Sequence, residues 1–139
     1  MGESPRQSWV RTAVLLGIGY ALVGIAFAVP ATHMQAWRLA AWVVSAAGYA
    51  AHIAHERFRR QNSPGVAALH VAFAVAVGAF GLAVSANIHS LSTGSTSQHR
   101  TLLLLAFGIW PLITALPAFL VAYGTNIVLA RALGSVPRQ

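Results

Sequence analysis

Polar and charged residues interrupt the chain at intervals and leave four long apolar segments between them. The segments cover residues 12–29, 39–55, 66–88 and 101–130 and consist mainly of Ala, Val, Leu, Ile and Gly. About 20 consecutive apolar residues are enough for a helix to cross the hydrocarbon core of a bilayer. The pattern therefore predicts four transmembrane helices.

The connections between the four segments are too short to form a separate folding unit. The longest connection, residues 89–100, is rich in Ser and Thr, as is typical of a loop. We therefore expect an all-α integral membrane protein with one domain over residues 1–139. Its four transmembrane helices are expected to form an up-down bundle.

The fourth segment differs from the others in length and in its prolines. From Thr101 to Leu133 it would form a helix of about 50 Å, which exceeds a hydrocarbon core of ~30 Å. Pro111 and Pro117 lie within it, and each removes a backbone donor and crowds the preceding turn. We expect the fourth helix to be kinked at these two prolines.

Small residues at helical spacing indicate the faces on which the helices pack. In a bilayer, helices associate by close approach at Gly, Ala and Ser rather than by hydrophobic burial. Gly17 and Gly24 mark such a face on the first segment, and Gly78 and Gly81 mark one on the third. The same faces suit packing within one chain and contacts in a homo-oligomer, so both interpretations are open.

The few charged residues lie near the ends of the apolar segments. Charged residues make up 8% of the chain and apolar residues 57%, and the basic residues are all arginines. By the positive-inside rule, the side of the membrane with more arginines is cytoplasmic. This rule places the protein in the plasma (inner) membrane as a multi-pass protein with both termini in the cytoplasm. The cytoplasmic side would hold Arg6, Arg11, Arg57, Arg59, Arg60, Arg131 and Arg138, and the other side Arg38 and Arg100.

These arginine clusters also indicate the partners of the chain. The formal net charge of +7 is spread over short clusters next to the apolar segments. A nucleic acid would require one water-facing basic patch with aromatic residues, which the pattern does not supply. We therefore expect the lipid bilayer and its anionic headgroups as the partner, and no nucleic acid.

A polar stripe is expected along the second helix. At about 100° per residue, its polar side chains fall within an arc of about 100°. Such a stripe is unfavourable against lipid, so it should face the bundle interior, a water-filled cavity or a partner subunit. It is either a path for a proton, an ion or a small polar substrate, or a hydrogen-bonded structural seam. The stripe comprises Arg38, Trp42, Ser45, Tyr49, His52, Glu56 and Arg59.

Glu56 and the histidines near it are the candidate chemical groups of the chain. Glu56 is expected to pair locally with Arg59 or Arg60. His52 and His70 are expected at similar depth on neighbouring helices, because the connection between these helices is short. Two facing imidazoles can hold a haem, and His52, Glu56 and His70 can hold a divalent metal. The candidate haem or metal ligands are therefore His52, His55 and His70, with hydrogen-bonded or interfacial histidines as the alternative.

The residue inventory argues against most enzyme classes. The chain has no cysteine, and its acidic residues are Glu3 and Glu56. Thiolate sites and cysteine nucleophiles are excluded, and no triad of nucleophile, base and acid can be assembled. Three functions stay open. They are a homo-oligomeric transporter or channel lined by the polar stripe, an accessory or scaffold subunit of a membrane complex, and a haem- or metal-binding membrane protein.

Overall fold

The described part of the chain is entirely helical. The structure is a computed structural model that describes residues 5–27, 34–93 and 97–134, with side chains for 9–27, 35–92 and 101–133. The expected all-helical fold is therefore observed. The elements are α1 (Pro5–Ala26), α2 (Met34–Ala54), the π-helix η1 (His55–Arg59), α3 (Pro64–Thr93) and α4 (Ser97–Gly134).

Three of the described helices are long and apolar enough to cross a membrane. These spans are Trp9–Ala26 in α1, Pro64–Ser92 in α3 and Thr101–Leu133 in α4. α2 is not among them, because it carries Arg38 and His52 within a shorter apolar stretch. The three helices indicate a membrane protein. The count of four spans is not confirmed, and α2 as a span stays a prediction.

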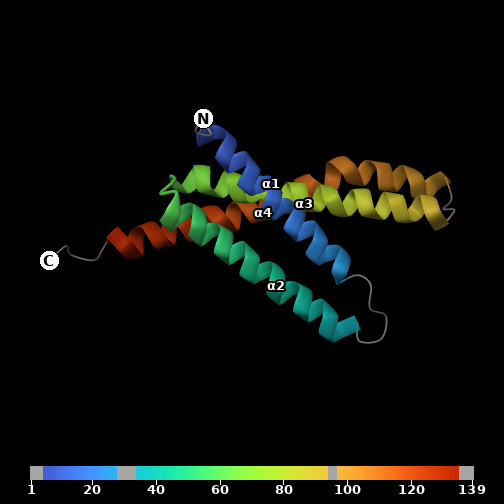
Figure 1. The fold of residues 1–139 in the computed structure, drawn as a ribbon, viewed down its shortest axis with the longest axis horizontal. Helices are drawn as coiled ribbons and strands as arrows, with labels where there is room; N and C mark the ends of the chain where they lie inside the picture. The colour runs from blue at the N-terminus through green and yellow to red at the C-terminus, as the bar shows by residue number, and fades with distance from the viewer. Residues whose placement is uncertain (1–4, 28–33, 94–96, 135–139) are drawn as a thin grey trace.

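Successive helices run in opposite directions (Figure 1). The beginning of α1, the connection from α2 to α3 and the end of α4 therefore lie at one end of the molecule. α3 lies at the centre and packs against both α1 and α4. α2 meets the other helices near its C-terminal end and diverges from them toward its N-terminal end. The fold is thus a tightly packed three-helix unit with α2 beside it.

α1 and α3 approach each other closely at glycines on both helices. A methyl group added to Gly17 would lie 2.6 Å from Cβ of Val77, and one added to Gly78 would lie 2.8 Å from Cβ of Tyr20. These distances are shorter than any van der Waals contact, so only glycine allows this approach. A methyl group added to Gly81 would likewise lie 2.8 Å from Cβ of Ala21, whereas one added to Gly24 would meet the end of the Leu82 side chain, 2.7 Å from Cδ2.

Replacing Gly17 with alanine is expected to destabilise the contact between α1 and α3. Overpacking of this kind costs about 1–3 kcal/mol. Gly19 on the same helix is a matched control, because no atom lies within 4 Å of a methyl group added there. Thermal unfolding in detergent should give a lower Tm for Gly17→Ala than for Gly19→Ala. Equal Tm values would contradict this packing.

The connection between α3 and α4 is shorter than the sequence predicts. α3 continues to Thr93 and α4 begins at Ser97. The Ser92 hydroxyl donates a hydrogen bond to the His89 carbonyl at 2.7 Å, a local bond that allows a hydroxyl side chain within a helix. The prediction of a loop over residues 89–100 is therefore wrong over most of its length.

α4 continues as one helix through both of its prolines. Pro111 and Pro117 lie inside the element. Between them, the Thr114 hydroxyl lies 2.9 Å from the carbonyl oxygen of Trp110 and 3.1 Å from that of Pro111. The predicted kink is not confirmed and stays a prediction.

Candidate functional site

Glu56 is buried where η1 meets α3. It is 1% exposed and is the only acidic residue in the described part of the chain. Its Oε2 atom accepts a hydrogen bond from Asn62 Nδ2 at 2.7 Å and lies 2.8 Å from His70 Nδ1. Its Oε1 atom lies 3.5 Å from Arg60 Nε, so the expected ion pair forms with Arg60, while Arg59 is exposed. Glu56, Arg60, Asn62 and His70 form the Glu56 cluster.

A tight reversal of the chain assembles this cluster. η1 is a five-residue π-helix, a form that is often found at functional sites. Gln61 follows with a φ of 51°, in the left-handed region. The backbone N–H of Asn62 donates to the backbone carbonyl of Glu56 at 3.4 Å. Pro64 begins α3, where its missing N–H is tolerated. His70 is thereby brought back beside Glu56.

α1 encloses the Glu56 cluster from the other side. The Trp9 ring stacks on the His70 imidazole, with centroids 4.3 Å apart and an interplanar angle of 8°. Arg60 donates from Nη2 to Thr12 Oγ1 at 3.1 Å. The Glu56 cluster therefore links η1, α3 and α1.

The polar stripe of α2 divides into inward-facing and exposed residues. His52 is 2% exposed, and neither ring nitrogen has a hydrogen-bond partner within the described residues. The Tyr49 hydroxyl donates to the carbonyl of Ala118 on α4, and Ser45 is half-buried. The members of the stripe from Ser45 to Glu56 therefore face the interior. The exposed members are Arg38, Trp42 and Arg59.

The candidate haem or metal ligands differ in their exposure and in their partners. His55 is exposed, and His70 is engaged by Glu56 and Trp9. Over the described residues, no three or more His, Asp or Glu side chains are grouped to hold a metal ion. Haem or metal ligation by His52, His55 and His70 therefore stays a prediction.

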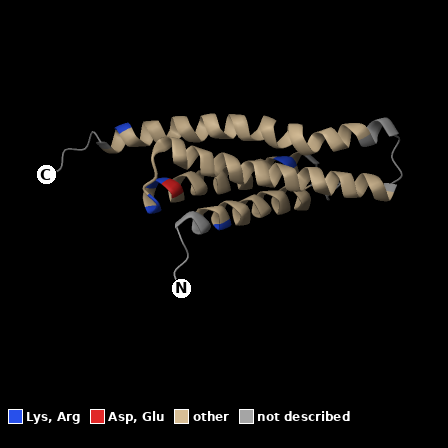
Figure 2. Cartoon of the chain, turned by 90° about the horizontal axis from the view of Figure 1, so that it is seen from above, with Lys and Arg blue, Asp and Glu red and all other residues tan. Residues whose placement is uncertain are grey.

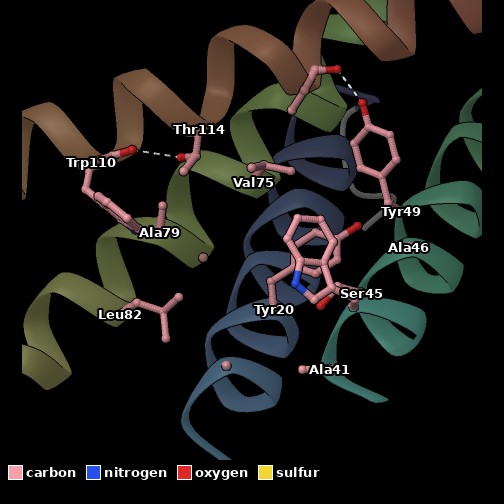
Figure 3. Close-up of a pocket in the computed structure, with 14 residues that line it drawn as sticks. Tyr20, Ala41, Ser45, Ala46, Tyr49, Val75, Ala79, Leu82, Trp110 and Thr114 are labelled. Atoms are coloured by element: carbon pink, nitrogen blue, oxygen red, sulfur yellow. Dashed lines mark hydrogen bonds between the residues drawn. The ribbon is translucent and has the colours of Figure 1, made fainter. Parts of the chain in front are cut away.

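A lateral cleft opens between α2 and the other three helices (Figure 3). Its volume is about 590 Å³, and its wall is mainly apolar. Small side chains such as Ala46 on α2 and Ala79 on α3 leave this space. Tyr20, Ser45 and Thr114 add hydroxyl groups to the wall, and no charged side chain of the described residues lines it. Such a cleft suits a neutral, largely apolar molecule.

The lateral cleft and the Glu56 cluster adjoin along one face of α2. Tyr49 lines the cleft, and His52 and Glu56 follow it at intervals of about one helical turn. The Tyr20 hydroxyl on the facing helix is buried and has no hydrogen-bond partner among the described residues. A polar face therefore leads from the cleft to the buried carboxylate.

Arginines gather at the end of the molecule that holds the Glu56 cluster (Figure 2). They come from η1 and the residue after it and from the last turn of α4. Arg6, Arg100 and Arg138, which the predicted orientation also uses, lie outside the described side chains. The orientation of the chain in the membrane therefore stays a prediction.

Several parts of the site were not predicted from sequence. The Asn-Ser-Pro sequence at residues 62–64 is a turn and helix-start signal that places Asn62 near Glu56. No local signal places Trp9 or Thr12 there, because their approach depends on the packing of α1 on α3. The lateral cleft likewise follows from the divergence of α2.

Comparisons with protein-family models, with curated proteins and with solved structures found no match for this chain. The Glu56 cluster and the lateral cleft are therefore the features of this chain that bear on its function.

Proposed function

We propose that this protein is a small membrane transporter. It would bind a lipophilic substrate in the lateral cleft and couple the transport of this substrate to proton exchange at Glu56. The observation that carries this proposal is the burial of Glu56 at 1% exposure within a cluster that links several helices. Ionisable side chains buried in membrane proteins are energetically expensive and usually functional. His52 lies one turn away on the same face, and its ring nitrogens have no hydrogen-bond partner among the described residues. It therefore extends the path along which a proton would move.

Proton exchange at Glu56 would change how the helices are held together. The ionised carboxylate accepts the hydrogen bond from Asn62 and attracts Arg60. A proton on Glu56 would remove this negative charge and one acceptor position. The link from η1 to α3, and through Arg60 to α1, would then weaken. Because α2 leads directly into η1, the protonation of Glu56 would bias the position of α2.

The lateral cleft is the proposed substrate site. α2 forms one wall of the cleft, and the Tyr49 hydrogen bond joins this wall to α4. A shift of α2 would therefore alter the shape of the cleft. The apolar wall and its few hydroxyl groups favour a neutral, lipophilic substrate over an ion.

The proposal includes the membrane arrangement that the sequence predicts. α2 would complete four spans, with both termini in the cytoplasm of a plasma (inner) membrane protein. Self-association of such chains is compatible with the exposed apolar faces of all four helices. A scaffold function is the competing interpretation, in which a partner helix fills the lateral cleft.

A proton-entry assay tests the proposal. The purified protein is reconstituted into liposomes that contain the pH dye pyranine. Under an imposed pH gradient with valinomycin and K⁺, wild-type vesicles should acidify faster than protein-free vesicles. Glu56→Gln should reduce the protein-dependent rate about tenfold or more, because the amide does not exchange a proton. His55→Gln is the matched control, since His55 is exposed. Equal rates for wild type and Glu56→Gln would contradict the proposal.

A further inference from the structure

A second, smaller hollow lies between η1 and the end of α4. Its volume is about 260 Å³, and it is lined by Arg57, Phe58, Gln61 and Leu133. None of these residues belongs to the Glu56 cluster or lines the lateral cleft. The span Thr101–Leu133 ends at the hollow, and the span Pro64–Ser92 begins just after it. The hollow therefore lies at one end of both candidate spans, where such spans would approach the lipid headgroups.

Arg57 gives the hollow a positive charge that no described side chain neutralises. Arg57 is half-buried, and no hydrogen bond or ion pair joins it to another described residue. The acidic group of the described chain, Glu56, is already engaged by Arg60 and His70. A guanidinium group that is partly withdrawn from water is stabilised by an anion, and a phosphate fits its planar fork.

The rest of the hollow combines one amide with apolar side chains. Phe58 from η1 is 55% exposed and Leu133 from α4 is 52% exposed. Gln61, with its φ of 51°, also lines the hollow and carries a side-chain amide. Non-glycine residues in this left-handed region cluster at ligand sites, where the surroundings hold them. The set of groups matches a ligand with an anionic head and an apolar chain.

We propose that this hollow binds the phosphate group of an anionic amphiphile. The Arg57 guanidinium holds two phosphate oxygens, the Gln61 amide donates to one of them, and Phe58 contacts the apolar chain. A bilayer phospholipid and a soluble phosphate ester share this head chemistry. The exposed Phe58 and Leu133 favour the phospholipid. The proposal does not depend on transport through the lateral cleft.

Native mass spectrometry of the detergent-purified full chain tests this proposal, because it measures the binding of added lipids. Phosphatidylglycerol should bind about tenfold more tightly than zwitterionic phosphatidylcholine. Arg57→Gln should raise the Kd for phosphatidylglycerol about tenfold. Arg59→Gln is the matched control, because Arg59 is exposed and does not line the hollow. Equal losses in the two variants, or no preference for phosphatidylglycerol, would overturn the site.

A competition experiment assigns the source of the phosphate. If sn-glycerol 3-phosphate displaces phosphatidylglycerol from the wild type and not from Arg57→Gln, the site takes a soluble phosphate ester. If it does not compete and Leu133→Ser weakens phosphatidylglycerol binding, the site takes a membrane lipid. Either result supports a phosphate site at Arg57. Binding of neither ligand above the level seen with Arg57→Gln would overturn it.

Discussion

Replacing Glu56 with alanine is expected to lower the free energy of unfolding by about 3–5 kcal/mol. The carboxylate is 1% exposed and is the common partner of Asn62, His70 and Arg60. Alanine would leave the Asn62 and His70 groups without their acceptor and Arg60 without its counter-charge. Denaturation of the purified protein by SDS, followed by circular dichroism, measures the loss.

An exposed arginine and a double-mutant cycle provide the controls. Arg59→Ala should change the free energy of unfolding by less than about 0.5 kcal/mol, because Arg59 is exposed. In the cycle with His70→Ala, the combined loss should be smaller than the sum of the single losses by about 0.5–3 kcal/mol. Strict additivity would show that Glu56 and His70 do not stabilise each other.

Replacing Ala46 with phenylalanine is expected to prevent binding in the lateral cleft. Ala46 is exposed on the wall that α2 contributes, so a ring at this position occupies the space of the ligand. The steric cost is comparable to overpacking, about 1–3 kcal/mol, which corresponds to about 5- to 150-fold weaker binding. The neutral dye N-phenyl-1-naphthylamine is a suitable probe. Energy transfer to it from Trp42 and Trp110, which line the cleft, reports occupancy.

The neighbouring alanine separates filling of the cleft from general effects on the helix. Ala47 is exposed but does not line the cleft. Ala47→Phe should retain the saturable part of the energy transfer that Ala46→Phe loses. The same signal in both variants would show that the dye binds elsewhere, in the detergent or on another face. Stoichiometric co-purification of a second membrane protein, lost on Ala46→Phe, would favour the scaffold interpretation.

The apolar runs were sufficient to predict helices but not where those helices end. Hydropathy reports the length of chain that lipid can cover, whereas a helix continues as long as its backbone bonds are made. α3 therefore extends to Thr93 through polar residues that bond to their own backbone. In α2, hydropathy has the opposite shortcoming. Arg38 and His52 lower the mean hydropathy of α2 below that of the candidate spans, although α2 is a continuous helix.

The sequence was sufficient to predict the site residues on α2 and η1, but not the residues that contact them. Helical periodicity alone places Tyr49, His52 and Glu56 on one face, and these three residues are inward-facing in the structure. The bond from Glu56 to His70 depends on a π-helix and on a left-handed residue, neither of which has a strong local signal. The lateral cleft depends on the angle between α2 and the packed helices, which is set by contacts distant in sequence.

The most direct test of the central claim measures whether the lateral cleft and Glu56 are coupled. Pyranine-loaded proteoliposomes would be assayed for proton entry with and without N-phenyl-1-naphthylamine. We predict that the dye changes the protein-dependent rate of proton entry in the wild type and has no effect in Glu56→Gln or Ala46→Phe. A rate that is the same with and without bound dye in the wild type, or a dye effect that persists in Glu56→Gln, would contradict the coupling.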